Sequence, residues 1–493
     1  MTLMENAGAG AAEIVKELCA AGSRVLVICG GGNNAGDGYV VARRLLEAGW
    51  QVSVVSLVAP ERLGGDAEKN YQAHAALSAL PTLCDLDEAL PLLRAELTGL
   101  GTTDVIVDAV FGTGLDRAVE GRFARALTLL NGSPARRIAL DVPSGLCADT
   151  GNVLGTAVLA QDTVCFAERK LGLCTSTGAR HGGRVRVVDI GIPAGLAQDV
   201  GFESELVEAV DARSWLVPRS LDVHKRSAGH VLCFAGSLGT SGAALLCAQG
   251  ALRSGAGLVT LAGFSETRAV LEPRVLEAMT AALDEGQLEA SLDALLVRAD
   301  SVVIGPGFGT GERERRVIRH VALRANKPVV VDADAITCFA HGATELAQSS
   351  ASLVLTPHPG ELGRLLGCST AEVEANRFLA ATRAAKETDA VVVLKGPYSL
   401  IARAGERTWI NDGAAPVLAT AGSGDVLAGA VAAFACGLDA KRAAALAVYL
   451  HALSGRLWQR RSGADRGMLA REIADGIPLA IADLASSPGM LPD

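Results

Sequence analysis

The stretch Arg24-Val-Leu-Val-Ile-Cys-Gly-Gly-Gly-Asn-Asn-Ala-Gly-Asp-Gly38 decides the fold of the first half of the chain. Residues 24–29 become continuously apolar after Arg24, which is typical of a strand buried on both faces of a sheet. A glycine loop follows, and residues 39–48 are expected to form a helix. A buried strand that runs through a glycine loop into a helix indicates a parallel α/β sheet.

The same alternation continues along the chain. In the first half, further strands are expected at residues 51–58, 104–109, 137–142 and 184–190. In the second half, strands are expected at residues 230–235, 258–262, 301–304, 328–332, 352–356 and 390–395. A helix is expected at residues 242–254, and Ala-rich helices run from Gly424 to the end. Continuous apolar strands between helices predict mostly parallel sheets that are covered on both faces.

A break in this alternation divides the chain. The 493 residues exceed what one hydrophobic core usually supports, so two or more domains are expected. Residues 201–221 bring several glutamates and Pro218, and a polar run follows at residues 222–227. We therefore expect a linker at residues 208–221 between a first domain, residues 1–207, and a second, residues 222–493. No repeat relates the halves, so two different three-layer α/β domains are expected, the first Rossmann-like.

Composition and charge exclude several classes of protein. Hydrophobic residues make up 49% and charged residues 20%, which is a globular composition. The net charge of −9 disfavours nucleic acid as a partner, because such binding depends on lysines and arginines that displace counterions. The 11 cysteines are scattered without zinc-site spacing, and residues 1–10 do not resemble a signal peptide. The apolar run at residues 426–438 is too short to cross a membrane, so a cytoplasmic protein is expected.

The glycine loop carries the first candidate site. Glycines let the backbone approach a ligand, and the helix that follows offers free N–H groups. The spacing Gly30-x-Gly32-x-x-Ala35 fits a dinucleotide fingerprint, yet the second strand ends at residues 57–60 without the acidic residue that would hold a ribose. A tight turn without a ligand is the alternative. The polar side chains of Asn33, Asn34 and Asp37 argue against it, because a mere turn does not require them.

Two further motifs place carboxylates at strand ends. They are Asp108-Ala-Val-Phe-Gly-Thr-Gly-Leu115 and Asp141-Val-Pro-Ser-Gly-Leu146. In open α/β sheets, ligands bind outside the carboxyl ends of the strands. Oxygen atoms from such loops suit a hard monovalent or divalent cation better than a transition metal.

Together with residues 3–8 and residues 166–173 around Lys170, these motifs closely resemble NAD(P)H-hydrate epimerase over nearly all of residues 1–200. That family interconverts the R and S forms of NADH or NADPH hydrated at nicotinamide C6 (NADHX and NADPHX), with potassium in the site. The resemblance implies that potassium is held by Asn34, Asp108 and Ser144. It implies substrate contacts at Asn33, Asn34, Ala35, Gly36, Asp37, Gly112, Thr113, Gly114, Leu115, Asp116, Arg117, Ala118 and Asp141. Asp141 is the expected proton donor and acceptor.

The chain departs from this family in two places. Ala35 stands where the family usually has glycine, a change that the start of a helix should tolerate. The chain also begins almost at the motif of residues 3–8, without the helix that precedes it in the family. Either the start codon is misplaced or the domain has a shortened N-terminal edge, and the second alternative would affect its packing and its dimer contact.

The second candidate site lies in Thr420-Ala-Gly-Ser-Gly-Asp-Val-Leu-Ala-Gly429. Gly422 and Gly424 allow a tight turn whose N–H groups converge, and the helix that begins there adds positive potential. Asp425 on its first turn is well placed to accept a proton from a hydroxyl that attacks a phosphate. The alternative is an aspartate that caps its own helix. Against it, Asp425 follows the glycines instead of preceding them.

Three more strand ends converge with this turn. Residues 303–309 form a glycine-rich loop, residues 355–361 present His358 in a rigid turn, and residues 395–399 begin with Lys395, a cation suited to phosphate. A single histidine or lysine would more often be an incidental surface residue. At the ends of three parallel strands, these residues predict a site.

From about His224 to the last helices, the chain resembles the ribokinase-like ATP- or ADP-dependent NAD(P)H-hydrate dehydratase. The resemblance implies hydrate contacts at Ala243, Gly307, His358 and Asp425. It implies AMP contacts at Lys395, Gly396, Pro397, Tyr398, Ser399 and Gly424. The implied reaction phosphorylates the C6 hydroxyl with Asp425 as base, then eliminates phosphate to give NADH or NADPH and AMP. ADP is the expected donor, with ATP as the alternative, and phosphoryl transfer generally implies magnesium.

The sequence thus predicts a bifunctional, homo-oligomeric repair enzyme that epimerises the hydrates and dehydrates the S form. One alternative is a ribokinase-type small-molecule kinase fused to a nucleotide-binding domain, which would leave the first half unexplained. Another is a regulatory protein that senses NAD(P)H and ADP without turnover. The presence of Asp141 and Asp425 favours catalysis, because binding alone would not need a base at either place.

Overall fold

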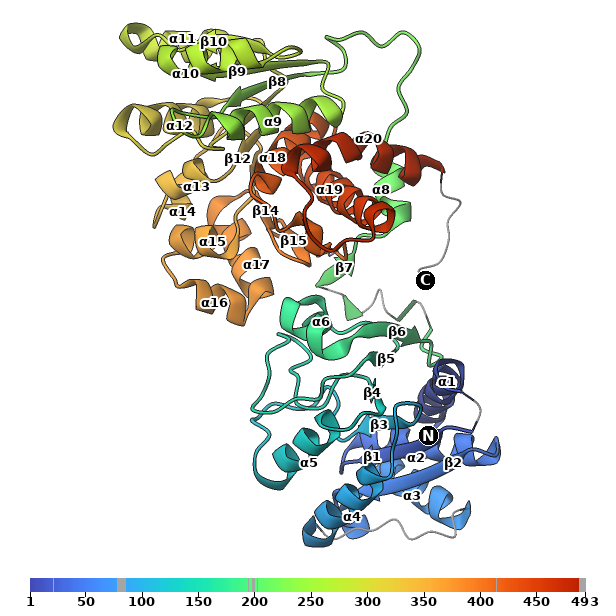
Figure 1. The fold of residues 1–493 in the computed structure, drawn as a ribbon. Coiled ribbons are helices and arrows are strands. Elements are labelled where there is room, and N and C mark those ends of the chain that lie inside the picture. Colours follow the sequence, from blue (N-terminus) through green and yellow to red (C-terminus); the bar gives the residue numbers. More distant parts are fainter. Residues whose placement is uncertain are drawn as a thin grey trace. The chain divides into compact units, whose positions relative to one another are not determined.

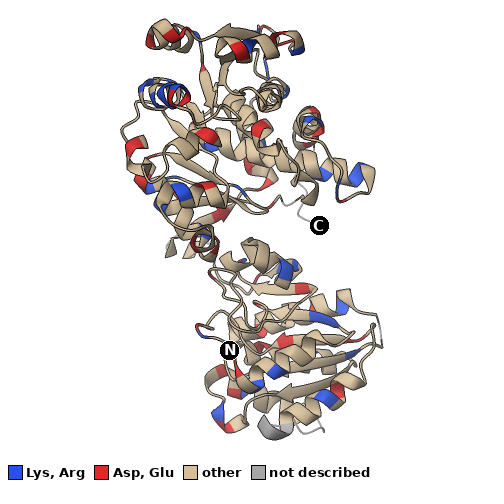
Figure 2. Cartoon of the chain, turned by 60° about the vertical axis from the view of Figure 1, so that its left-hand side comes forward, with Lys and Arg blue, Asp and Glu red and all other residues tan. Residues whose placement is uncertain are grey.

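The computed structural model describes residues 1–20, 22–77, 86–193, 195–196, 200–201, 203–413 and 415–486. It consists of two compact units, Met1–Gly201 and Phe202–Asp493, each built on its own sheet (Figure 1). Both units are α/β, as the sequence predicts. In the view of Figure 2, Lys and Arg are interspersed with Asp and Glu over both units. Within the described residues, no helix is long and apolar enough to cross a membrane.

The first unit contains a six-stranded parallel sheet with the order β2-β1-β3-β4-β5-β6. Its strands are β1 Arg24–Cys29, β2 Gln51–Ser56, β3 Val105–Ala109, β4 Arg136–Leu140, β5 Asp162–Phe166 and β6 Arg184–Val188. Its longer helices are α1 Thr2–Leu18, α2 Asn33–Glu47, α3 Gly65–Leu77, α4 Leu86–Thr98, α5 Gly121–Asn131 and α6 Ser176–Gly182. Strand β5 was not predicted.

The side chains of β1 alternate between two hydrophobic cores, one on each face of the sheet. Val25, Val27 and Cys29 belong to the core shared with α1 and α2. Leu26 and Ile28 belong to the core shared with α4 and α5 on the other face. Successive strand residues point to opposite faces, so a strand that is apolar throughout is buried on both sides.

Helix α2 begins earlier than predicted, because the loop after β1 is only residues 30–32. The glycines read as loop residues instead allow close packing within the helix. A Cβ at Gly36 would lie 2.5 Å from the sulfur of Met4, and one at Gly38 would lie 2.6 Å from the Cβ of Ala109. Asn33 to Asp37 therefore lie in the first turns of α2 and are held as rigidly as the helix.

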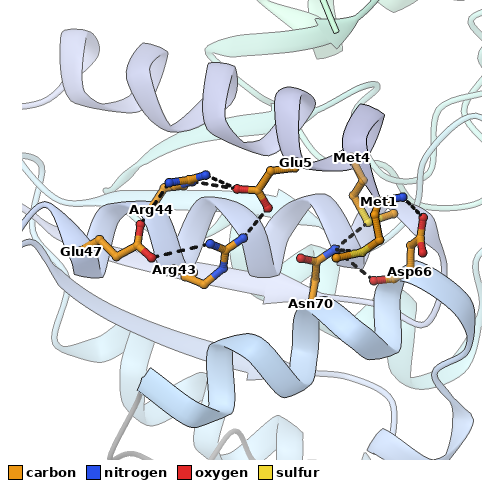
Figure 3. A network of polar contacts seen from close by, with 8 residues as sticks. All are labelled: Met1, Met4, Glu5, Arg43, Arg44, Glu47, Asp66 and Asn70. Atoms are coloured by element: carbon orange, nitrogen blue, oxygen red, sulfur yellow. Dashed lines mark hydrogen bonds and ion pairs between the residues drawn. The ribbon is translucent and has the colours of Figure 1, made fainter. Parts of the chain in front are cut away.

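Helix α1 forms the N-terminal edge of the first unit and packs into its core. Ala7, Ala11 and Val15 of α1 are buried in the core. On the side of α1 that faces α2 and α3, Figure 3 shows a polar network of charged residues and methionine sulfurs. In it, Glu5 forms ion pairs with Arg43 and Arg44.

The second unit contains a ten-stranded sheet with the order β10-β9-β8-β11-β12-β13-β14-β15-β16-β7. Its strands are β7 Ser204–Leu206, β8 His230–Phe234, β9 Leu258–Gly263, β10 Met279–Ala282, β11 Ser301–Ile304, β12 Val329–Val331, β13 Leu353–Leu355, β14 Val391–Leu394, β15 Ser399–Ala402 and β16 Thr408–Asn411. All neighbouring pairs are parallel except β14–β15 and β15–β16. This antiparallel β15–β16 hairpin was not predicted.

Helices cover this sheet on both faces. They are α8 Ala209–Trp215, α9 Ser241–Arg253, α10 Ser265–Leu271, α11 Leu288–Leu296, α12 Glu312–Arg324, α13 Asp334–Cys338, α14 Ala343–Leu346, α15 Pro359–Leu366, α16 Thr370–Ala375, α17 Arg377–Thr388, α18 Ser423–Ala435, α19 Ala440–Ser462 and α20 Ala470–Ser486. One core joins Val231 and Cys233 of β8 to α9, α18, α19 and α20. Leu232 and Phe234 point to the opposite face and are also buried.

The boundary between the units lies before the predicted linker. Strand β7 pairs with β16 and so belongs to the second sheet, although residues 1–207 were assigned to the first domain. In the predicted linker, residues 208–221, the first half forms α8 instead. Trp215 of α8 stacks on Trp409 of β16, with ring centroids 4.9 Å apart, and Arg213 Nε donates to the carbonyl of Leu484. The glutamates that suggested a linker are exposed residues of this segment: Glu203 precedes β7, Glu205 lies in it, and Glu208 is the N-cap of α8.

Candidate active sites

The first candidate site lies where the strand order of the first unit reverses. Strand β1 has β2 on one side and β3 on the other, and such a reversal opens a crevice at the carboxyl ends of the strands. At this point Gly30 closely approaches the loop after β3: a Cβ on it would lie 2.0 Å from the Val110 carbonyl oxygen. Only glycine allows this approach, which brings the start of α2 beside the Asp108 motif.

The three predicted potassium ligands lie together in this crevice. Asp108 is fully buried, and its carboxylate accepts hydrogen bonds from the Ser144 amide at 2.8 Å and the Ser144 hydroxyl at 2.6 Å. Burial raises the pKa of Asp108 to about 6, and the hydrogen bonds from Ser144 oppose that rise. Asn34 Nδ2 donates to the Phe111 carbonyl at 3.0 Å. Phe111 in turn donates its amide to Ser144 Oγ at 2.8 Å.

The amide oxygen of Asn34 is an acceptor that the other residues of this site leave unused. It is buried and has no hydrogen-bond partner, and an unpaired buried acceptor is costly. A cation bound by this oxygen would remove that cost. Within the described residues, no group of three or more His, Cys, Asp or Glu is arranged to hold a metal. One carboxylate with neutral amide and hydroxyl oxygens therefore fits a weakly charged hard cation such as potassium.

A second group in the first unit can move protons. Asp141 follows β4 with φ of 64°, a strained value for a residue with a side chain, and forms an ion pair with Lys170. Lys170 also donates to the Phe166 carbonyl at 2.7 Å. Burial and the charge of Asp141 raise the pKa of Asp37 to about 8, whereas Lys170 lowers it. At neutral pH, Asp37 therefore carries a proton beside an ion-paired carboxylate.

The other predicted epimerase contacts differ in how close they lie to these groups and in how exposed they are. Gly112 lies against Asn34: a Cβ on it would be 3.3 Å from the Asn34 Cβ. The rest of residues 112–118 continue the loop between β3 and α5 and are mostly exposed. Asn33 is exposed, whereas Ala35 is fully buried in the core between α1 and α2. The side chain of Ala35 therefore serves packing.

The second candidate site is built around the start of α18. Gly422 is the N-cap with φ of 86°, and a Cβ there would lie 2.3 Å from Leu246 Cδ1. No side chain caps this helix. The Ser423 amide donates to the Thr420 carbonyl at 3.3 Å, and the amides of the next residues are left for another partner such as an anion. Asp425 lies inside the first turn and is not the N-cap, so the capping interpretation is wrong.

Charged side chains gather around Asp425. Lys395 Nζ donates to Asp332 Oδ1 at 3.0 Å and lies 3.8 Å from Glu361 Oε2. Burial alone would lower the pKa of Lys395, but Asp332 and Glu361 raise it above its ordinary value, so it is a cation. Burial and the charge of Asp332 raise the pKa of Asp425 to about 7. Such a carboxylate can accept a proton near neutral pH.

A cavity of about 500 Å³ adjoins this turn. It is lined by five of the six predicted AMP contacts, namely Lys395, Gly396, Pro397, Ser399 and Gly424. Tyr398 is outside the described lining. Apolar walls come mainly from Pro416, Leu418, Leu427 and Val448. A mostly apolar pocket with a few polar groups and a lysine at one end suits a nucleotide, with its base inside and its phosphates beside α18.

The predicted hydrate contacts fall into two places. Gly307 lies next to Ala243, with a built Cβ 3.0 Å from that of Ala243, at the reversal of strand order between β8 and β11. Thr240 Oγ1 donates to the Gly307 carbonyl at 2.7 Å and fixes this loop. His358 instead caps α15: its Nδ1 accepts from the Gly360 amide at 3.0 Å. Its ring remains about half exposed and can still reach a ligand.

Sequence reasoning missed several residues at this site. Asp332 ends a predicted strand as Asp108 does, so the same pattern could have identified it. Glu361 was quoted only as part of the turn that presents His358. His451 lines the cavity, and its Nε2 lies 3.1 Å from the Ser423 carbonyl and 3.2 Å from the Ser423 hydroxyl. Burial lowers the pKa of His451 to about 4. Its position within a long Ala-rich helix gives no local signal.

Comparisons with known proteins match each half of the chain to a protein family. Residues 231–479 match the family model for NAD(P)H-hydrate dehydratase, and residues 1–172 match that for the YjeF-related protein N-terminus. A bifunctional NAD(P)H-hydrate repair enzyme of Moorella thermoacetica is 40% identical, with 98% of this chain and 93% of that protein covered. One of Escherichia coli is 34% identical, covering 96% of this chain and 87% of that protein.

A solved structure supports the assignment of the second unit. The ADP/ATP-dependent NAD(P)H-hydrate dehydratase of Bacillus subtilis, co-crystallised with ATP and Mg²⁺, is 29% identical with a TM-score of 0.50. The match covers 56% of this chain and 97% of that one. Two family models in tandem, relatives aligned over nearly the whole chain, and the two sites described above lead to one assignment. This chain belongs to the family of bifunctional NAD(P)H-hydrate repair enzymes.

Proposed function

We propose that each unit performs one of the two repair reactions, at the site described for it. The observation that carries this proposal is the position of Asp425, on an uncapped helix start beside a nucleotide-sized cavity. A binding protein would not need a carboxylate with a raised pKa next to an anion site. A small-molecule kinase would use the same geometry, but would leave the first unit without a role.

In the first unit, the proposed reaction inverts C6 of the hydrate. Asp37 gives its proton to the C6 hydroxyl, which leaves as water while the lone pair of the ring nitrogen forms a C6–N double bond. Water then adds to the opposite face and returns a proton to Asp37. Asp141, ion-paired with Lys170, stabilises the positive charge that develops on the ring. The acid–base role that the sequence analysis gave to Asp141 alone is thus divided between Asp37 and Asp141.

Potassium fits the oxygen atoms of this unit. Asn34 Oδ1, Asp108 and Ser144 would hold it, because the first is buried without a partner and the other two lie within one hydrogen-bonded group. The ion would supply a fixed positive charge to anchor an oxygen of the substrate. The exposed loop of residues 112–118 would cover the substrate from the other side.

In the second unit, the proposed reaction is phosphoryl transfer followed by elimination. Asp425 accepts the proton of the C6 hydroxyl as that oxygen attacks the terminal phosphate of ADP, and AMP leaves. Lys395 and the free N–H groups of α18 neutralise the charge on the transferred group. Loss of phosphate from C6 with a proton from C5 then restores the ring double bond.

Magnesium would accompany the nucleotide, as ATP and Mg²⁺ do in the Bacillus subtilis relative. Asp332, Glu361 and Asp425 supply carboxylate oxygens at this edge, but Lys395 occupies the space between the first two. The donor set therefore fits an ion held mainly by nucleotide phosphates, with few protein ligands. Its bound charge would offset the negative charge of the phosphates.

Three further proposals concern the compartment, the phosphate donor and the assembly. The described cysteines are all free thiols, most of them buried, which favours a reducing compartment such as the cytoplasm. We retain ADP as the proposed donor and a homo-oligomer as the proposed assembly. Thermal shift with ADP against ATP and the mass of the protein in solution test these two points.

The test uses separate epimers of NADHX and NADPHX with ADP or ATP. S-hydrate with nucleotide should regain the absorbance of the reduced nicotinamide. It should release AMP and phosphate when ADP is the donor, or ADP and phosphate when ATP is the donor. R-hydrate should do so only when the first unit is active. Accumulation of a stable phosphorylated hydrate would indicate a kinase, and binding without turnover would indicate a sensor.

A further inference from the structure

The turn between β12 and α13 is strained and carries two carboxylates. Its residues are Asp332, Ala333 and Asp334, and Ala333 has φ of 47° and ψ of −113°. This conformation is unfavourable for a residue with a Cβ, and such strain concentrates at functional sites. The strain allows the two aspartates on either side of Ala333 to point in different directions.

Each aspartate holds a different part of the site. Asp334 accepts a hydrogen bond at 2.9 Å from the Gly309 amide, in the glycine loop that contains Gly307. Asp332 is 1% exposed and accepts from the Thr356 hydroxyl at 2.7 Å and from Lys395 Nζ at 3.0 Å, both on Oδ1. A single strained turn therefore connects the glycine loop to the lysine of the nucleotide cavity.

The Asp332–Lys395 pair is poorly explained as a stabilising contact. A buried ion pair is often no more stabilising than apolar side chains of the same size, because both charges lose their hydration. Lysine also has a long flexible side chain, whose ammonium is not confined by its own geometry. Fixing that ammonium would matter most where a charge develops during a reaction, and Lys395 lines the cavity beside Gly424.

We propose that Asp332 is a positioning residue of the dehydratase, which acts by holding the Lys395 ammonium between the nucleotide cavity and Asp425. The proposal rests on the phosphoryl transfer proposed above. In this arrangement Asp332 touches neither substrate nor nucleotide. It fixes the cation that neutralises the transferred phosphoryl group, and Thr356 fixes Asp332.

The arrangement has a second, electrostatic consequence. The charged groups that act on Asp425 are Asp332 and Asp334, which raise its pKa together with burial, and Lys395, which lowers it. Replacing Asp332 by asparagine removes one negative charge, so the pKa of Asp425 should fall. The acidic limb of the dehydratase pH–rate profile should then move to lower pH. Replacing Lys395 by methionine should move that limb to higher pH.

The experiment compares Asp332→Asn, Lys395→Met and the double variant in the full chain, with S-NADHX and ADP. Asp332→Asn should lower kcat at least about tenfold with little change in the KM for ADP, because a transition-state contact is weakened. Added to Lys395→Met, it should cost little more, since it acts through that lysine. Asp300→Asn is the matched control. Asp300 accepts a hydrogen bond from the His230 amide at the amino ends of the strands, whereas the site lies at their carboxyl ends.

Several outcomes would overturn the inference. These are multiplicative losses in the double variant, a pH limb that does not move, and a lower melting temperature with normal turnover per folded molecule. If Asp332→Asn does not fold, the pH shift of Lys395→Met alone decides the question, and its absence counts against the inference. Asp425→Asn distinguishes failure of this inference from failure of the proposed function. Normal turnover in that variant contradicts the proposed phosphoryl transfer itself.

Discussion

The two candidate sites share a backbone arrangement but differ in their side chains. Both lie at the carboxyl ends of parallel strands, where a glycine turn leads into a helix, at α2 in the first unit and α18 in the second. In the first, side-chain oxygens of Asn34 and Asp108 gather, and one oxygen is left unpaired. In the second, the helix start is uncapped and Lys395 lies beside it. Under the proposed function, side chains decide whether a glycine turn receives a cation or an anion.

The largest expected effect tests the anion site. Asp425→Asn keeps size and polarity but removes the base, so dehydratase turnover should fall by at least about a hundredfold. ADP should bind as well or slightly better, because a negative charge has gone. Turnover and melting temperature measured on the same variant provide the check. Epimerase activity of the same sample is the internal control, and its loss would indicate global damage.

The next effect tests the proton group of the first unit. Asp37 must be protonated to act as an acid, so epimerase activity should be full well below pH 8 and decline as pH rises through its pKa of about 8. Asp37→Asn should lower the rate about a hundredfold and remove that decline. Asp66→Asn, on α3 and paired with the N-terminal amine, is the matched control. A pH decline that persists in Asp37→Asn would assign the acid to another group.

A smaller effect is expected at the cation site. Asn34→Ala removes the unpaired oxygen, so epimerase activity should fall at least about tenfold and lose its dependence on potassium. Dehydratase turnover of the S-hydrate should be unchanged. Rates of R-to-S conversion in potassium and in sodium buffers measure this. Equal rates of the unaltered protein in both buffers would remove potassium from the site.

The smallest effect concerns the independence of the two units. Residues 1–201 and 203–493, made as separate polypeptides, should each fold and keep rates close to those of the full chain. A second pair, divided at residue 216, should behave worse, because it separates β7 and α8 from their partners β16, α19 and α20. Circular dichroism melts and both assays compare the pairs. Equal behaviour of the two pairs would contradict the boundary.

The sequence predicted what local patterns encode. The apolar run of residues 24–29 and the glycine turns at Gly30 and Gly422 were identified because burial and backbone freedom leave clear signs. The start of α2 was missed because glycine normally disfavours helices. Gly36 and Gly38 occur within this helix because of their close tertiary contacts. His451 and the Asp332–Lys395 pair are brought together from distant parts of the chain. No window of sequence contains that information.

The pairing of β7 with β16 has a consequence for synthesis on the ribosome. Ser204 lies opposite Thr408, so the first strand of the second unit finds its neighbour only after most of that unit has been made. The first unit can fold as soon as it emerges, while the segment behind it stays extended. A chain that terminates before residue 408 would present β7 and the unfinished sheet without partners, and exposed strand edges promote aggregation. Truncated products should therefore be removed by proteolysis instead of persisting as half-active enzymes.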